Sequence, residues 1–385
     1  MEVLNGIDRI LKEDFGLKGK SLGLVTNHSG LTRELRSSID IIHEKFNLKA
    51  LYAPEHGVRG EIEAGDNIDT YTDKRTGLPV YSLYSSKGNT DQKNQRPASS
   101  MLAGIDMLLI DIQNIGCRFY TYESTMFNCM EECARAGITF IVLDRINPIN
   151  GVDIDGNISS AKYRSFIGIG PVTNRHVMTM GELAQYYNKE CDINCDLKVI
   201  EVKNWKRDYY SDKIGFQWVN PSPNIPGIDT ALLYPGTCLF EGTTLSEGRG
   251  TTRPFEQIGA PHLDADELAA AMNGQNLPGV IFRPAHFLPS FSKHQGVSCH
   301  GVQLHIIDRS VYKPVLTAVK LLKEIITISG DKFAYREGNK PTDRRSIDLL
   351  AGTDLLRIEG PESYLELCKK DTVIFKEKRQ QYLLY

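Results

Sequence analysis

The sequence lacks the features that mark membrane proteins and nucleic-acid-binding proteins. No run approaches the about 18 consecutive apolar residues that a membrane-spanning helix needs. The formal net charge is only −3, and Lys and Arg are spread along the 385 residues, so no basic patch favours nucleic acid or an anionic membrane surface. We therefore expect neither nucleic acid nor a membrane as a partner.

Cysteine is scarce, with eight residues in the whole chain, which is too few for a disulfide scaffold of this length. Cys129 with Cys133, and Cys191 with Cys195, are four residues apart, whereas zinc and redox sites favour the C-x-x-C interval. We predict free buried thiols and no structural metal.

The nucleotide-binding motifs are also missing. Gly19, Lys20 and Ser21 imitate the end of a P-loop, but Asp14 stands where a Gly is required, and the triplet precedes a strand instead of following one. The turn at 26–30 lacks the G-x-G-x-x-G spacing that lets a backbone approach a pyrophosphate. No cofactor is therefore expected. The absence of G-x-S-x-G weakens an esterase interpretation as well.

The N-terminus shows no export signal, because acidic residues stand where a signal peptide has a basic region followed by an apolar one. The sequence as written predicts a cytoplasmic protein. A periplasmic or extracellular location is expected instead if a leader has been removed.

Apolar runs and turn formers alternate through the first 200 residues or so. Strands are predicted at 21–26, 48–53, 105–112, 138–143 and 197–202, with helices at 37–46, 123–136 and 181–190. Thr179 and Glu182 fit a capping box for the last of these helices. This alternation predicts an α/β fold with a Rossmann-like, doubly wound and mostly parallel sheet.

The pattern changes from about residue 260. A helix capped by Asp264 and Glu267, strands at 280–283 and 299–307, a helix at 312–328 and an amphipathic tail helix at 376–385 are predicted. We therefore predict a Rossmann-like catalytic domain at 1–238, followed by a smaller α+β auxiliary domain at 239–385. The first loops of the auxiliary domain, 239–260, are expected to border the cleft because they are long and aperiodic.

Polar residues follow four of the predicted strands. Asn27 and His28 follow the first, Glu55 the second, Gln113 the third, and Arg145 the fourth. Because the carboxyl ends of parallel strands meet at one edge of a sheet, we expect these side chains to form one site. The segment 66–94, polar and rich in turn formers, is interpreted as a functional flap beside it.

The residue types around this edge suit a sugar. Tyrosines provide faces for pyranose rings, and amides and acids pair with hydroxyl groups. A glycosidase needs a carboxylic acid that protonates the leaving oxygen, and Glu55 fits this role. A second carboxylate can act as base or nucleophile, and Asp111, Glu247 and Glu241 are the candidates, which the sequence cannot rank.

Seven long blocks resemble, in order, those of the bacterial exo-β-N-acetylmuramidases, a family long known only as a domain of unknown function. The blocks are GLVTNHSG (23–30), LYAPEHGVRG (51–60), TGLPVYSLY (76–84), IDMLLIDIQNIGCRFYTYEST (105–125), VLDRINPING (142–151), WVNPSPNIPG (218–227) and LFEGTTLSEGRGTTRPFEQIGAP (239–261). The resemblance implies release of N-acetylmuramic acid (MurNAc) from the non-reducing end of peptidoglycan fragments, in cell-wall turnover and recycling. It also implies that Glu55, in the P-E-H-G motif, is catalytic.

The resemblance implies a small glycan partner, MurNAc-GlcNAc (GlcNAc, N-acetylglucosamine) and related muropeptides. The candidate substrate-binding residues are Asn27, His28, His56, Arg59, Tyr84, Gln113, Arg118, Tyr120, Tyr122, Asn220, Ser222, Asn224 and Arg249. The second catalytic group is either a protein carboxylate or the 2-acetamido oxygen of the substrate itself. Two other functions stay open, namely a metal-assisted hydrolase with His28, His56 and Asp111 as ligands, and a muropeptide-binding protein without catalysis.

Overall fold

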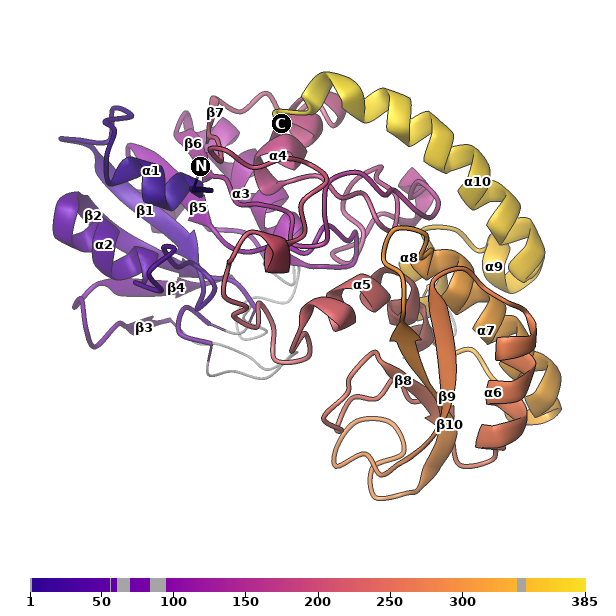
Figure 1. The fold of residues 1–385 in the computed structure, drawn as a ribbon. Coiled ribbons are helices and arrows are strands. Elements are labelled where there is room, and N and C mark those ends of the chain that lie inside the picture. The colour runs from indigo at the N-terminus through magenta and orange to yellow at the C-terminus, as the bar shows by residue number, and fades with distance from the viewer. Residues whose placement is uncertain (1, 56, 61–69, 84–94, 338–343) are drawn as a thin grey trace.

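The computed structural model describes residues 2–55, 57–60, 70–83, 95–337 and 344–385. Its first part is built on a seven-stranded sheet with the order β3-β4-β2-β1-β5-β6-β7 (Figure 1). The strands are β1 (Ser21–Thr26), β2 (Asn47–Ala53), β3 (Tyr71–Thr72), β4 (Pro79–Ser82), β5 (Met107–Asp111), β6 (Thr139–Leu143) and β7 (Leu197–Ile200). All pairings are parallel except that of β3 with β4 at the edge.

This strand order is that of a Rossmann sheet, so the predicted doubly wound, mostly parallel sheet is confirmed. The chain adds strands on one side of β1 as far as β4 and then continues on the other side with β5. The strands β1 and β5 pair in parallel, from Leu22 with Met107 to Thr26 with Asp111. β5 is buried along its whole length, as expected for a strand covered on both faces. The ends of β1 and β5 therefore mark the topological switch point.

Two strands of this sheet were missed, β3, which has only two residues, and β4. β4 lies inside the segment 66–94 that the sequence suggested was an irregular flap, and it pairs in parallel with β2. It is only four residues long and begins with a proline, so its apolar pattern is too short to predict a strand. Residues 66–69 and 84–94 of this segment, which include Tyr84, lie outside the described residues, as do His56 and residues 61–65 before it.

Helices cover both faces of the sheet. They are α1 (Gly6–Ile10), α2 (Ser38–Lys45), α3 (Tyr122–Ala136) and α4 (Met180–Glu190). The predicted capping box of α4 is confirmed, because Glu182 N donates to Thr179 Oγ1 at 3.2 Å and Thr179 N donates to Glu182 Oε2 at 3.0 Å. Short 3-10 turns occur at Ser99–Leu102, Ala161–Tyr163, Ser211–Lys213, Cys238–Gly242, Gly330–Lys332 and Arg379–Tyr382.

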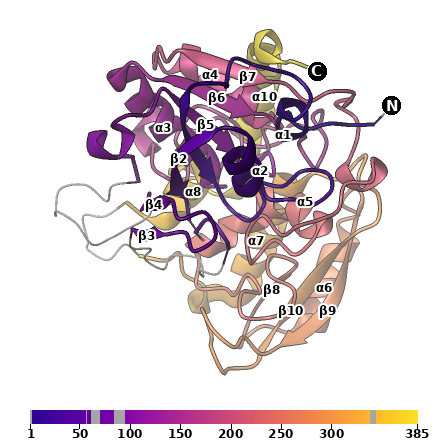
Figure 2. The ribbon, with the colours of Figure 1, turned by 90° about the vertical axis from the view of Figure 1, so that its left-hand side faces the viewer.

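The second part has a three-stranded antiparallel sheet of order β8-β10-β9, which confirms the predicted α+β unit. Its elements are β8 (Gln257–Ala260), α6 (Ala265–Gly274), β9 (Val280–Phe287), β10 (Cys299–Ile306), α7 (Pro314–Ser329), α8 (Ser346–Ala351), α9 (Leu355–Ile358) and α10 (Pro361–Lys378). The sheet lies below the first part in both ribbon views (Figures 1 and 2). β8 was not predicted, because it ends a long loop without periodicity.

The helix α5 (Ile228–Thr237) joins the two parts and packs against α7. At Gly236 the backbones are so close that a Cβ atom would lie 2.0 Å from the carbonyl oxygen of Pro314. One hydrophobic core runs through this junction and includes Tyr52 beside the sheet, Leu322 of α7 and Phe375 of α10. The two parts are thus held together by shared apolar burial, and the division at residue 238 stays a prediction.

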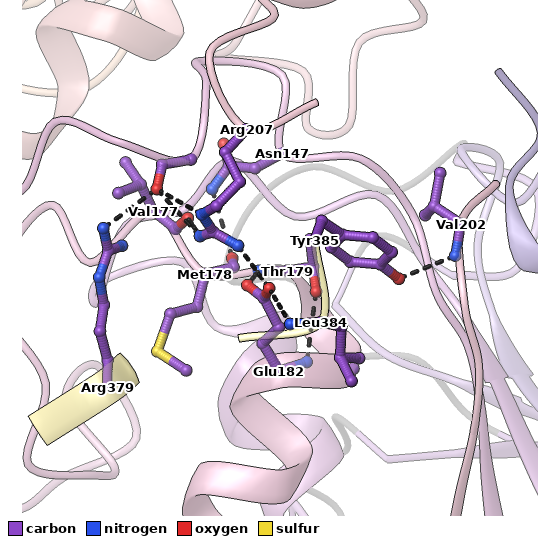
Figure 3. Close-up of polar contacts among 12 residues, drawn as sticks. Asn147, Val177, Met178, Thr179, Glu182, Val202, Arg207, Arg379, Leu384 and Tyr385 are labelled. Carbon is purple, nitrogen blue, oxygen red and sulfur yellow. Dashed lines mark hydrogen bonds and ion pairs between the residues drawn. The ribbon is translucent and has the colours of Figure 1, made fainter. Parts of the chain in front are cut away.

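The predicted tail helix at 376–385 is wrong in its limits. The helix α10 starts at Pro361, ends at Lys378 and spans from the second part back to the first (Figure 1). The last residues are extended and bond to the first part: Leu384 N donates to Glu182 Oε1 at 2.9 Å (Figure 3), and Tyr385 Oη donates to Asp144 Oδ2 at 2.6 Å. These tertiary hydrogen bonds replace the helical ones.

All eight cysteines are thiols, and seven of them are buried, as predicted. None of the described helices combines the length and apolar character needed to cross a membrane.

Candidate active site

Glu55 stands two residues beyond the carboxyl end of β2 and is partly buried. The hydroxyl of Thr121, which precedes α3, donates a hydrogen bond of 2.8 Å to Glu55 Oε2. This bond joins the loops that follow β2 and β5, two strands that flank β1. It fixes one oxygen of the carboxyl group and leaves the geometry of the other to a ligand.

Two buried tyrosines support Glu55 from the segment around Thr121. The rings of Tyr120 and Tyr122 meet edge to face with centroids 5.0 Å apart. Burial raises the pKa of both phenols well above the ordinary value. The nearby Glu55 raises both pKa values further, and Tyr122 also raises that of Tyr120. Both phenols therefore stay protonated, and that of Tyr122 donates to Pro221 O at 2.6 Å.

The loop 216–225 closes over this edge of the sheet. His28 Nε2 lies 2.6 Å from Asn220 O, which links the turn after β1 to the loop. Gly60 faces the same imidazole, since a Cβ atom there would lie 2.4 Å from His28 Nδ1, and its φ of +82° also requires glycine. Ser222 lies beside Tyr120 and opposes the increase of its pKa.

Side chains of the residues that follow β1 and β5 fill the topological switch point. Asn27 Oδ1 accepts from the Ser29 hydroxyl at 2.6 Å, and Ser29 Oγ in turn accepts from Gln113 N at 3.0 Å. The Gln113 side chain donates to the carbonyls of Asn114 and Ile146 at 2.7 and 2.9 Å. The cavity beside them holds only about 50 Å³. These residues tie β1 and β5 together next to the site.

Asp111 is held in a buried ion pair. Arg145 Nε and Nη2 donate to its two oxygens at 2.6 and 2.9 Å, and Nη2 also donates to Leu31 O. Asp111 is fully buried and Arg145 is 5% exposed. Both carboxylate oxygens thus face a cation of the protein.

Two predicted substrate contacts are engaged elsewhere. Arg59 forms a bidentate ion pair with Asp73 at 3.2 and 3.0 Å, which raises the pKa of the guanidinium and ties the Glu55 loop to the segment before β4. Arg118 is fully buried and donates to the main-chain oxygens of Asn157, Val172 and Leu350. We leave Arg118 out of the proposed site, because its outer nitrogens are occupied by the protein.

The remaining acidic candidates form one charged cluster in the second part. Arg249 donates to Glu241 Oε1 at 3.0 and 2.7 Å and lies 3.5 Å from Glu247. Lys293 Nζ lies 2.6 Å from Glu247 Oε2, and burial lowers its pKa. The cluster is connected to Tyr120 by two rings, since Arg249 lies over Phe255, Phe255 contacts Tyr234, and Tyr234 contacts Tyr120.

The strand ends thus bring Glu55, Asn27, His28, Gln113, Tyr120 and Tyr122 together with the loop residues Asn220 and Ser222. Asn224 is buried in the same loop. Sequence reasoning missed Thr121, although it lies between two predicted contacts and just before a predicted helix. It also missed Ser29. Within the part of the chain that the structure describes, no group of three His, Cys, Asp or Glu side chains is arranged to hold a metal ion.

Comparison with known proteins covers nearly the whole chain. Residues 22–229 match the N-terminal domain of the exo-β-N-acetylmuramidase NamZ, and residues 232–385 match its C-terminal domain. The peptidoglycan β-N-acetylmuramidase NamZ of Bacillus subtilis (strain 168) is 43% identical over 392 residues, which span all of this chain and 92% of that protein.

Two solved structures of Bacteroides fragilis NCTC 9343 proteins, both described as members of the DUF1343 family, share the fold. One superposes with a TM-score of 0.90 at 37% identity, the other with 0.76 at 31% identity, and each alignment covers all of this chain and 99% of the other. The resemblance noted from the sequence blocks is confirmed. The chain belongs to the exo-β-N-acetylmuramidase NamZ family.

Proposed function

We propose that Glu55 is the general acid of an exo-acting glycosidase that releases MurNAc from the non-reducing end of MurNAc-GlcNAc and related muropeptides. The observation that supports this role is the hydrogen bond from Thr121 to Glu55 Oε2, at the carboxyl end of β2 and above two buried tyrosines. The family relationship makes the chain a β-N-acetylmuramidase acting on peptidoglycan-derived glycans.

The chemistry needs a proton at the glycosidic oxygen as its bond to the anomeric carbon breaks. Glu55 supplies this proton from the oxygen that Thr121 does not hold. The tyrosine pair beneath it excludes water, and the amides of Asn220 and Asn224 provide partners for sugar hydroxyls. We place this site in the predicted catalytic domain, with the loops 239–260 on its border.

We propose that the 2-acetamido oxygen of the substrate is the nucleophile. Asp111, Glu241 and Glu247 are each bound to at least one cation, and freeing Asp111 would break a buried ion pair at a cost of about 3–5 kcal/mol. In this mechanism the acetamido oxygen bonds to the anomeric carbon as the GlcNAc oxygen leaves with the proton of Glu55. Water then opens the cyclic intermediate, and Glu55 takes up a proton from it.

The test of the acid role compares the wild type with Glu55→Gln on two substrates. On MurNAc-GlcNAc, whose leaving group needs a proton, kcat should fall by roughly 10²–10⁴. On 2,4-dinitrophenyl MurNAc, whose leaving group needs none, the loss should be far smaller. Glu44→Gln, an exposed carboxylate on α2, is the matched control and should behave as the wild type.

Near-normal turnover of the disaccharide by Glu55→Gln would overturn the proposed role. If the wild type binds the disaccharide and returns it intact, the chain is a binding protein instead. The nucleophile is tested with N-trifluoroacetyl substrates, whose weaker acetamido oxygen should slow the wild type at least tenfold. An unchanged rate would point to a protein carboxylate, and Asp111→Asn, Glu241→Gln and Glu247→Gln would then identify it.

A further inference from the structure

A second cavity lies on the outer face of α3, between residues 95–96 and 164–169. Its volume is about 290 Å³, close to the lower limit of small-molecule sites (about 300–1,000 Å³). None of the proposed substrate contacts described above lines it. It is therefore a separate feature, and its chemistry can be considered by itself.

A stripe of polar side chains on α3 connects this cavity to Glu55. Thr121, Thr125 and Asn128 follow one another at intervals of four and three residues, so they share one face of the helix. Thr121 bonds to Glu55, Thr125 bonds to Thr121 O at 3.3 Å, and Asn128 lines the cavity. At about 1.5 Å per residue, Asn128 lies about 10 Å along the axis from Thr121. This distance suits the second sugar on the leaving-group side of the cleaved bond.

The cavity wall offers polar atoms without partners. Asn128 is 4% exposed, and its Nδ2 donates to Gln95 O at 2.8 Å. Its Oδ1 and the hydroxyl oxygen of Ser165 are buried and make no hydrogen bond within the described residues. An unpaired buried acceptor costs stability, so these atoms are suited to the N–H and O–H groups of a ligand. The half-buried Phe166 lines the same cavity and can provide an apolar surface.

The cavity also carries a positive charge that no described acidic group balances. Arg96 is paired with Glu131 and lies 3.5 Å from Glu132. Arg164, in contrast, lies over the Phe127 ring at 4.6 Å and forms no ion pair with any described carboxylate. A ligand with a carboxylate near its hydrogen-bonding groups would complement this wall.

We propose that this cavity is a distal subsite for the second MurNAc unit of a longer glycan, whose lactyl carboxylate binds Arg164. The proposal rests on the proposed function. When MurNAc occupies the Glu55 site, the next sugar is GlcNAc and the one after it is again MurNAc. That third sugar brings a lactyl carboxylate to Arg164, and its acetamido and hydroxyl groups to Asn128 and Ser165. The enzyme therefore distinguishes glycan chains from free disaccharide.

The test compares kcat/KM for MurNAc-GlcNAc and for the tetrasaccharide with two such repeats. The wild type should prefer the tetrasaccharide by about tenfold, as one charge-assisted contact provides. Arg164→Gln should lose this preference and keep the disaccharide rate, and Arg164→Lys should keep part of the preference. Arg36→Gln, an exposed arginine paired with Glu44, is the control. A tetrasaccharide with an esterified internal lactyl group should behave like the disaccharide.

Equal kcat/KM for the two glycans in the wild type, or a preference that survives in Arg164→Gln, would overturn the subsite. If the preference for the tetrasaccharide survives esterification, groups other than the carboxylate cause it. That result would also overturn the proposed subsite. If the wild type cleaves neither glycan, the proposed function fails. The subsite is then decided by calorimetry with Glu55→Gln, which should bind the tetrasaccharide about tenfold more tightly than the disaccharide. Equal affinity would refute it.

Discussion

The hydroxyl of Thr121 donates a hydrogen bond of 2.8 Å to Glu55 Oε2, and so connects the start of α3 to the loop after β2. The strands β2 and β5, which flank β1 in the parallel sheet, bring these two segments together, although 66 residues separate them in sequence. The bond selects one oxygen of the carboxyl group. In the proposed mechanism, the other oxygen carries the proton for the substrate.

Removing this hydrogen bond should affect the rate more than the fold. For Thr121→Val we expect kcat on MurNAc-GlcNAc to fall roughly tenfold to a hundredfold, because Glu55 becomes charged as it gives up its proton and a hydrogen bond to a charged group contributes about 1.5–3 kcal/mol. KM should change little, and Thr121→Ser, which keeps the hydroxyl, should stay close to the wild type. Steady-state kinetics check this prediction, and equal kcat values for Thr121→Val and Thr121→Ser would contradict it.

Gly60 offers a test of the His28 position. Gly60→Ala places a methyl group 2.4 Å from His28 Nδ1 and should move the ring away from Asn220 O, lowering kcat/KM at least tenfold. Gly77→Ala is the matched control, because Gly77 has a similar φ of +72° but no atom within 4 Å of the added Cβ. Both variants should lose about 1–2 kcal/mol of stability from backbone strain. The hypothesis fails if they lose activity equally.

Removing one partner of the buried pair of Asp111 and Arg145 should strongly destabilise the protein. Arg145→Met leaves a carboxylate buried without its cation, and we expect the free energy of unfolding to fall by about 3–5 kcal/mol. The double variant Asp111→Leu/Arg145→Met should recover much of this loss, because no unpaired charge is then buried. Urea denaturation measures both effects. A single variant within 1 kcal/mol of the wild type would show that the pair is dispensable.

Asp144 should make stability depend on pH. Burial raises its pKa from 3.8 to about 6, so the native state binds the proton more tightly than the unfolded state. The contribution of Asp144 is fully present below about pH 4 and is lost as the pH rises to about 6. The stability of Asp144→Asn relative to the wild type should therefore improve by about 3 kcal/mol over this range. A difference independent of pH in urea titrations would contradict the assignment.

Tyr385 is expected to stabilise the same carboxyl group. Its phenol donates to Asp144 Oδ2 at 2.6 Å. The same phenol oxygen accepts from Val202 N at 2.8 Å (Figure 3). Tyr385→Phe should lower the free energy of unfolding by about 1–3 kcal/mol, because two buried polar groups lose a partner. Tyr209→Phe, at a partly exposed ring beside Lys206, is the control and should change it by less than about 0.5 kcal/mol.

Much of the first part could be predicted because its signals are local. The apolar runs gave β1, β2, β5 and β6 within two residues of their limits, and the rule that ligands bind at strand ends brought Glu55, Asn27 and Gln113 to one edge. The helix α5 was missed because Pro235 and Gly236 disfavour a helix locally. It forms through close packing on α7, which no local pattern encodes.

The ion pairs and hydrogen bonds in and around the site could not be predicted from the sequence for a similar reason. Arg118 was predicted to contact the substrate, but its side chain donates a hydrogen bond to Leu350 O, 232 residues away in sequence. Likewise, the pairing of Asp111 with Arg145 depends on the neighbouring positions of β5 and β6. A charged residue at a strand end can face a ligand or another charge, and only the three-dimensional arrangement decides between them.

The contact between Tyr385 and Asp144 has a consequence for synthesis of the protein. Asp144 leaves the ribosome 241 residues before Tyr385 does. A Rossmann sheet that forms during synthesis therefore lacks the hydrogen bond from Tyr385 to Asp144 at first. The bond forms only after the second part has been made and α10 has crossed back over the first. Folding of the two parts is thereby coupled in time, and the sheet reaches its full stability only after Tyr385 has been made.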